Sequence, residues 1–173
     1  MIEEDRAQFA AVLEFLHQTP NKLALLTEGL LLAELCLKHS ADEFSVLENL
    51  CHLRDLETQG YSPRISRMLA EKDPVLADFD GARVAAEGDY NNQQPEVALR
   101  TFQIVRQENL EKLKSLTEEQ LGREASLEGV GRITLRRLAE MMCEHDEGHL
   151  EDVRVLRQRL EHCRGGTPWP PLR

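Results

Sequence analysis

Two histidines four residues apart carry the clearest chemical signal in the sequence. They are His145 and His149, in the segment CEHDEGHLED. On a helix, residues at i and i+4 have Cβ atoms about 5–6 Å apart, so both imidazole rings can converge on one divalent metal ion. The HExxH zinc helix uses the same spacing. Asp146 stands where that motif has its glutamate, so the assignment to that class of zinc enzyme does not transfer.

Both histidines lie in the middle of an apolar stripe, and we therefore expect them to face the core of the protein. An unpaired polar group in a core costs roughly 1–3 kcal/mol. One metal ion would satisfy both rings. The alternative is a pair of core histidines bonded to carboxylates across a helical bundle. The stripe steps by three or four residues through Leu135, Leu138, Met142, His145, His149, Val153, Leu156 and Leu160.

His52 is the candidate for a third ligand. It lies at the border of the apolar stripe of LENLCHLRDLE, a segment with strong helical periodicity. His17, His39 and His162 lie near predicted helix ends or in a connection, and we expect them to be solvated. Three histidines from two helices would leave one coordination position for water or substrate. Such an open position is typical of catalytic rather than structural zinc.

Charged residues near these histidines could support the site. Glu48 and Asp55 share the side of the helix that carries His52, so either could orient its ring. Asp146 could do the same for the other two histidines. Each of these acids could instead be a solvated helix carboxylate. Arg106 could meet an anionic substrate, although such an arginine is more often a surface residue with a buried stem.

The apolar spacing predicts helices as the elements that position these residues. Residues 3–17 repeat apolar positions at helical spacing, and Thr19-Pro20 should end that run. Residues 21–38 should be helical in part. Ser45 is a plausible N-cap for the helix that holds His52. Within that helix, Gly60 and Pro63 should introduce a kink or a division.

Two more helices complete the expected architecture, an all-α, four-helix bundle. One starts near Pro95, a residue suited to a first helical turn. The last is capped by Thr134 and runs to about His162. Residues 72–95, with one short helix, and residues 117–133 are expected to be long connections, and no run of alternating residues indicates a strand. We expect residues 1–164 to form one domain and residues 165–173 to form a proline-rich tail.

Composition limits the classes of function. The chain has 173 residues, 30% of them charged, and a net charge of −10, which disfavours nucleic acid as a partner. No apolar run reaches the roughly 18 residues that a transmembrane helix needs, so no membrane association is expected. The acidic start MIEEDRAQF lacks the features of a signal peptide, and a cytoplasmic location is the default expectation.

Two blocks of the sequence resemble the DinB-like superfamily. FSVLENLCHLRDLE, residues 44–57, is similar to the family's W-S-x-x-E-x-x-x-H-L-x-D-x-E block, with Phe44 where tryptophan is usual. GRITLRRLAEMMCEHDEGHLEDVRVLR, residues 131–157, is similar to the block G-x-x-T-L-x-x-L-x-x-x-x-x-H-D-x-x-H-L. RTFQIVRQENLEKLKSL resembles, more weakly, the helix between them. Together these blocks cover most of the chain from residue 44 onward.

The resemblance implies a four-helix bundle with up-down-down-up connectivity. It also implies a histidine triad that binds a divalent metal, commonly nickel or zinc. Carried over by position, the triad is His52, His145 and His149. The family's members are often homodimers, so a homodimer is expected here.

Three kinds of function remain open. Relatives in the family include enzymes that transfer low-molecular-weight thiols and metal-dependent hydrolases, so a small-molecule substrate is expected. A thiol S-transferase is the first hypothesis, because no general base is evident near the triad. A hydrolase is the second. The protein could instead be a non-enzymatic, metal-containing stress or interaction protein, or a bundle whose histidines are structural. The 72–95 connection is expected to border the site.

Overall fold

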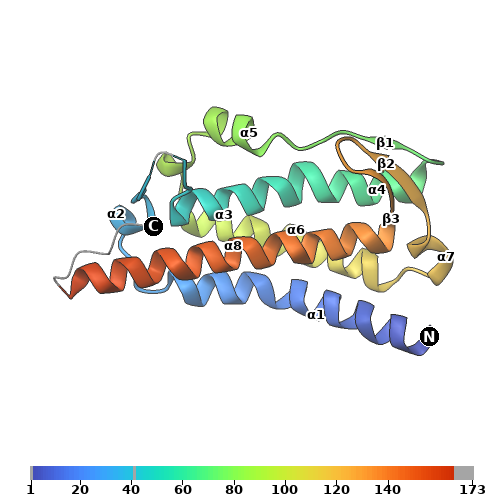
Figure 1. Cartoon of the computed structure of the whole chain (residues 1–173), viewed down its shortest axis with the longest axis horizontal. Coiled ribbons are helices and arrows are strands. Elements are labelled where there is room, and N and C mark those ends of the chain that lie inside the picture. The colour runs from blue at the N-terminus through green and yellow to red at the C-terminus, as the bar shows by residue number, and fades with distance from the viewer. Residues whose placement is uncertain (1, 41, 166–173) are drawn as a thin grey trace.

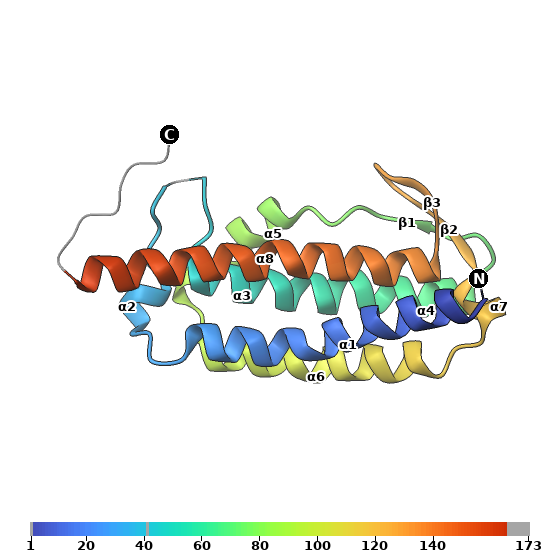
Figure 2. The same ribbon diagram turned by 60° about the horizontal axis from the view of Figure 1, so that its bottom comes forward.

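A computed structural model describes residues 2–40 and 42–165 of the chain. Four long helical segments form a bundle within this part, as Figures 1 and 2 show. The predicted four-helix bundle is therefore confirmed, whereas the up-down-down-up connectivity stays a prediction. The proline-rich tail lies outside the described residues, apart from Gly165. The segments are α1 (Ile2–Thr27), α3 to α4 (Val46–Asp55 and Ser62–Ala70), α6 (Pro95–Lys114) and α8 (Leu135–Arg164).

Side-chain caps start the two helices that carry the histidines. The Ser45 hydroxyl accepts a hydrogen bond from the backbone N–H of Glu48, and Thr134 does the same for Arg137. Each cap satisfies a donor that has no partner inside its helix. Both predicted N-caps are confirmed.

The predicted break at Thr19-Pro20 is wrong, because α1 continues through Pro20 to Thr27. Proline has no N–H, so Pro20 cannot donate to the carbonyl of Leu16 one turn earlier. Nη1 of Arg106 donates to that carbonyl at 3.3 Å. A partner from another helix thus occupies the acceptor that proline leaves free.

A π-helical turn, η1 (Leu56–Tyr61), joins α3 to α4 without a division. Pro63 follows in the first turn of α4, where the missing N–H does no harm. The wider turn changes which residues face inward, and both Glu57 and Tyr61 are buried in it.

The connections contain short elements; a short helix within residues 72–95 and partial helix within residues 21–38 were expected, whereas the strands were not. The expectation of no strands is wrong, because three short strands form one sheet in the order β1-β2-β3. Strands of two to four residues are too short to show an alternating pattern. β1 pairs with β2 in parallel, and β2 pairs with β3 antiparallel. The elements are α2 (Leu32–Leu35), β1 (Val75–Leu76), α5 (Gly81–Gly88), η2 (Tyr90–Asn92), α7 (Glu118–Leu121), β2 (Glu124–Leu127) and β3 (Gly131–Thr134).

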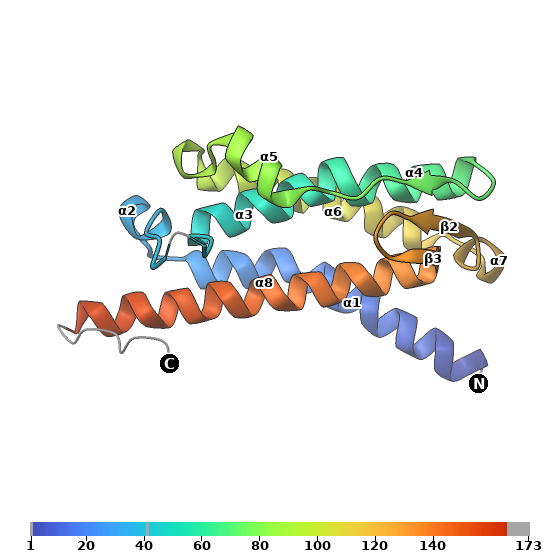
Figure 3. The same ribbon diagram turned by 45° about the horizontal axis from the view of Figure 1, so that its top comes forward.

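The segment from β1 to α5 runs along α4 and α3, as Figure 3 shows. Arginines of α4 hold its start: Nη1 of Arg67 donates to the carbonyl of Val75, and Nη2 of Arg64 donates to that of Ala77, both at 2.8 Å. This segment brings Phe79 and Gly81 to the ring of His52. The expected 72–95 connection therefore does border the triad.

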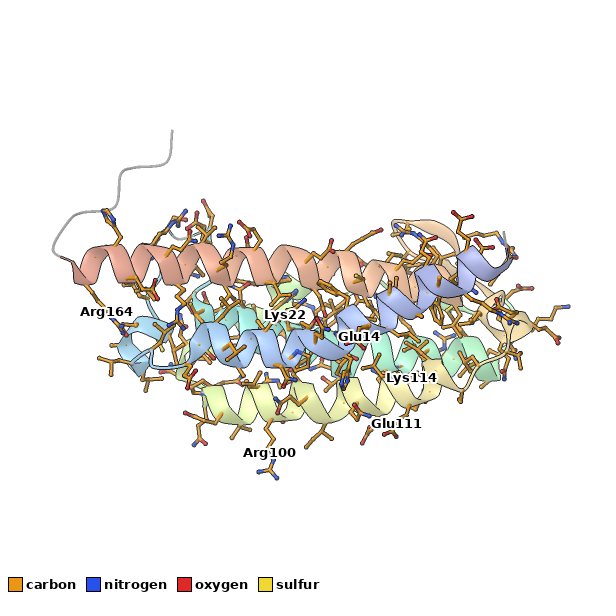
Figure 4. All side chains as sticks on the ribbon, turned by 90° about the horizontal axis from the view of Figure 1, so that it is seen from below. Glu14, Lys22, Arg100, Glu111, Lys114 and Arg164 are labelled. Atoms are coloured by element: carbon orange, nitrogen blue, oxygen red, sulfur yellow. The ribbon has the colours of Figure 1, made fainter. Side chains whose placement is uncertain are left out.

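Apolar side chains fill the interior in two clusters, and polar side chains cover the outside. One cluster includes Phe9 and Met142, and the other includes Leu23 and Phe102. Figure 4 shows Arg100, Glu111 and Lys114 pointing outward from α6. No described helix is both long and apolar enough to cross a membrane.

Candidate metal centre

Three imidazole rings converge between α3 and α8. Nε2 of His145 lies 3.2 Å from Nε2 of His52 and 3.2 Å from Nε2 of His149. One ligand nitrogen from each ring lies within 4.8 Å of the others, and no Cys, Asp or Glu among the described residues joins this group. The structure therefore brings together all three histidines that the sequence singled out.

The spacing of the three nitrogens fits a single ion. For Zn–N bonds of about 2.0–2.1 Å in tetrahedral geometry, ligand nitrogens lie roughly 3.3 Å apart. The two observed distances of 3.2 Å are close to that value, and the three nitrogens lie within 4.8 Å of one another. The donor set, three imidazoles, suits zinc, nickel, copper and iron.

Burial keeps the three rings in the neutral form that a metal requires. Burial, together with the nearby His149, lowers the pKa of His52 to about 4. Burial also lowers the pKa of His149 to about 4. The pKa of His145 falls to about 3, through burial and the neighbouring His149, His52 and Arg106. At neutral pH the metal-free site is uncharged, so no proton has to leave before an ion binds.

Asn49 fixes the orientation and the tautomer of His149. The amide nitrogen of Asn49 donates to the carbonyl of Ser45 at 2.9 Å, so Oδ1 faces the imidazole. Oδ1 lies 2.6 Å from Nδ1 of His149, which must then carry the proton. The lone pair of Nε2 consequently points at the other two rings. Asn49 was not predicted as a site residue; its position three residues before His52, on the same side of the helix, was the available signal.

Two aromatic rings and a closely placed glycine pack around His52. Its ring centroid lies 5.4 Å from that of Phe44 and 6.0 Å from that of Phe79. Gly81 lies against the ring edge, so closely that an added Cβ would be 2.6 Å from Cε1 of His52. Nδ1 of His52 and Nδ1 of His145 are buried without a partner in the described part of the chain.

A buried ion cluster lies beside the triad and corrects two expectations. Nη1 of Arg106 donates to Asp146 at 2.6 Å, and Nη2 donates to Glu57 at 2.8 Å. Nδ2 of Asn109 donates to the second oxygen of Glu57 at 2.7 Å. Arg106 is 1% exposed, so it does not meet a substrate, and Asp146 binds Arg106 rather than a histidine. Both side chains are buried in the bundle, where Arg106 binds Asp146 and Glu57 together. We call Glu57, Arg106, Asn109 and Asp146 the Arg106 cluster.

Glu48 and Asp55 make no hydrogen bond to His52, contrary to the expectation that either could orient its ring. Glu48 accepts a hydrogen bond from the backbone N–H of Ser45 at 2.7 Å and completes the helix cap. Asp55 binds Arg54 at 2.7 Å and the Tyr90 hydroxyl at 2.8 Å. Its role is therefore to attach the segment around η2 to α3.

The exposure of the triad differs from the expectation of a fully buried stripe. His52 is buried, whereas His145 and His149 are half-buried. The exposed residues Glu147 and Gly148 lie between these two histidines on α8, so this part of the helix is at the edge of the core. The centre therefore has a side that solvent approaches.

Comparisons with known proteins agree with this architecture. The DinB superfamily matches the chain over residues 15–153. The structure is similar to YfiT from Bacillus subtilis, with a TM-score of 0.83 and 21% sequence identity, over 90% of this chain and 89% of that one. YfiT is described as "a probable metal-dependent hydrolase with an unusual four-helix bundle topology". No individual curated protein matches the sequence.

Proposed function

The chain belongs to the DinB superfamily, and from this we propose that it binds one divalent metal ion through His52, His145 and His149 and is a metal-dependent enzyme. The observation that carries the proposal is the pair of 3.2 Å distances that join the three Nε2 atoms. Nickel and zinc are the proposed metals. A small molecule is the proposed substrate.

When bound, such an ion would supply Lewis acidity, which lowers the pKa of a bound water or thiol and polarises a substrate. The protein's own residues would prepare the site. Burial keeps the imidazoles neutral, and Asn49 directs the lone pair of His149. Phe44 and Phe79 place apolar rings beside His52.

Two reactions suit this arrangement. Hydrolysis is the first candidate, since the similar fold of YfiT is that of a described metal-dependent hydrolase. Transfer of a low-molecular-weight thiol is the second. It is favoured by the pairing of the nearby carboxylates: Asp55 binds Arg54 and Tyr90, and Asp146 binds Arg106. A thiol that ionises on a metal needs no carboxylate base, whereas hydrolysis often uses one.

The first experiment is elemental analysis of the full chain, purified without a histidine tag. We expect about one nickel or zinc ion per chain, and loss of that ion in His52→Ala. His17→Ala is the matched control, because His17 is an exposed histidine outside the triad. Equal metal content in the wild type and in His52→Ala would contradict the proposal. The protein would then be a bundle with structural histidines or a non-enzymatic, metal-containing protein.

The reaction is then assigned by two parallel screens of the metal-loaded protein. One pairs small thiols with electrophiles, and the other offers ester and amide substrates. Activity in only one screen, abolished by His145→Ala, would select that reaction. The homodimer and the cytoplasmic location stay predictions, and light scattering would test the first.

A further inference from the structure

A cavity of about 330 Å³ lies beside the candidate metal centre. It is formed by the segment before α3, the first turns of α3 and the C-terminal half of α8. We call it the Arg159 cavity. Its volume lies in the range of small-molecule sites, about 300–1,000 Å³. The lining residues used below are Glu43, Phe44, Asn49, Asp152, Leu156 and Arg159.

The Arg159 cavity shares a wall with the triad. Asn49, which lines the cavity, accepts the hydrogen bond from His149. Phe44, which also lines it, packs 5.4 Å from the ring of His52. A molecule in the cavity would therefore contact two of the residues that hold the proposed metal ligands.

Arg159 is a buried cation whose hydrogen-bonding capacity is only partly used. Its side chain is 8% exposed, and Nη1 donates to Glu43 at 3.0 Å. Among the described residues, the buried Nε has no partner and Nη2 has no acceptor. Unused donors on a buried guanidinium are costly. The Nε and Nη2 edge is the one that binds a carboxylate through two parallel hydrogen bonds, so the missing group has the chemistry of an anion.

The cavity lining also holds carboxylates: Glu43 pairs with Arg159, and Asp42 and Asp152 line the cavity too. Asp152 precedes Arg159 by seven residues on α8, which is about 10 Å along the helix axis. No hydrogen bond or ion pair joins the exposed Asp152 to another described residue, and partial desolvation of its carboxyl, with Glu151 and Glu43, raises its pKa. Such a carboxylate attracts a cation. Leu156 lies between the two charged residues and, with Phe44, supplies apolar surface.

We propose that the Arg159 cavity binds an elongated zwitterion, with a carboxylate at Arg159 and an ammonium group at Asp152. This molecule would be the substrate or co-substrate of the enzyme, a role that rests on the proposed metal-dependent function. The binding itself depends only on the cavity. The charge separation selects an ω-amino acid or a peptide-like molecule over a simple acid or amine.

Isothermal titration of the full chain with three probes tests this binding. The probes are 6-aminohexanoate, hexanoate and hexylamine, which share an alkyl chain and differ in their charged ends. We expect 6-aminohexanoate to bind about tenfold more tightly than either singly charged probe, since one charge-assisted hydrogen bond is worth about that factor. Equal affinity for all three, or no binding of 6-aminohexanoate, would overturn the proposal.

Two variants locate the site. Asp152→Asn should reduce the affinity for 6-aminohexanoate to that for hexanoate, and Arg159→Met should reduce it to that for hexylamine. Asp152 is exposed, so its variant keeps the test valid if loss of the Arg159–Glu43 pair disturbs folding. Arg100→Met is the control, because Arg100 points outward on α6 (Figure 4). Unchanged affinity in Asp152→Asn would place the probe elsewhere and refute the assignment.

The metal content of the same samples separates this proposal from the proposed function. Metal bound at the triad without binding of 6-aminohexanoate would refute the cavity assignment alone. Selective binding of 6-aminohexanoate to a chain that binds no metal would support the cavity and refute the metal-dependent enzyme.

Discussion

Oδ1 of Asn49 lies 2.6 Å from Nδ1 of His149, and the same amide donates to the carbonyl of Ser45, the N-cap of α3. The start of one helix thus determines the orientation of a ring on another. This pair links the local folding of α3 to the geometry of the candidate metal centre.

Asn49→Leu keeps the approximate size of the side chain and removes the acceptor for His149. We expect about 10–100-fold weaker metal binding, the usual effect of losing a hydrogen-bond partner of a ligating histidine. Competition with a coloured chelator would measure the dissociation constant. Asn49→Asp is the control, because it retains an acceptor oxygen and should bind metal at least as tightly as Asn49→Leu. Equal dissociation constants in the wild type and in Asn49→Leu would refute the orienting role.

Gly81→Ala should displace His52. The added Cβ would lie 2.6 Å from Cε1 of that ring, which is closer than real contacts allow. We expect a loss of metal content with little loss of helical structure. Elemental analysis and circular dichroism would measure the two quantities.

Gly148→Ala is the matched control for the substitution at Gly81. Gly148 lies between two triad histidines on α8, but nothing lies within 4 Å of its added Cβ. We expect full metal content and about 1 kcal/mol of added stability, since alanine is the better helix former. Metal loss in Gly148→Ala but not in Gly81→Ala would show that the contact with His52 is unimportant.

Arg106→Met should destabilise the protein strongly. It would leave Glu57 and Asp146 buried at 0% exposure without their common cation. Removing one partner of such a buried pair costs about 3–5 kcal/mol. Urea unfolding of this variant, beside the surface variant Arg100→Met, would measure the difference. A difference below about 1 kcal/mol would mean that the two acids take up protons or water at little cost.

Sequence patterns predicted the long helices and the triad for physical reasons. The apolar residues of α8 repeat at helical spacing, so His145 and His149 had to share a face. His52 could be joined to them because the DinB-like blocks place it on a second helix of the bundle. The first inference uses the helical period, which the sequence displays directly, and the second uses the resemblance to the family.

The remaining features depend on tertiary contacts that no local pattern records. Pro20 predicts the end of a helix from sequence alone. It is tolerated within α1 because Arg106 binds the carbonyl of Leu16. The sequence around Glu57 predicts an ordinary helix carboxylate. Glu57 is buried because the π-helical turn η1 changes which residues of the helix face inward. The sequence around Gly81 predicts only a loop glycine, and its contact with His52 is evident only in the structure.

Metal removal should lower the thermal stability of the wild type. An ion that binds only the folded state at about 100 times its dissociation constant adds about 2.7 kcal/mol. For a domain of this size, that corresponds to about 5–10 °C in Tm. Differential scanning calorimetry before and after dialysis against a chelator would measure the shift, and added zinc or nickel should reverse it. The same treatment should leave the Tm of His52→Ala unchanged, because two imidazoles bind an ion far more weakly than three. An equal shift in both proteins would mean that the stabilising ion binds outside the triad.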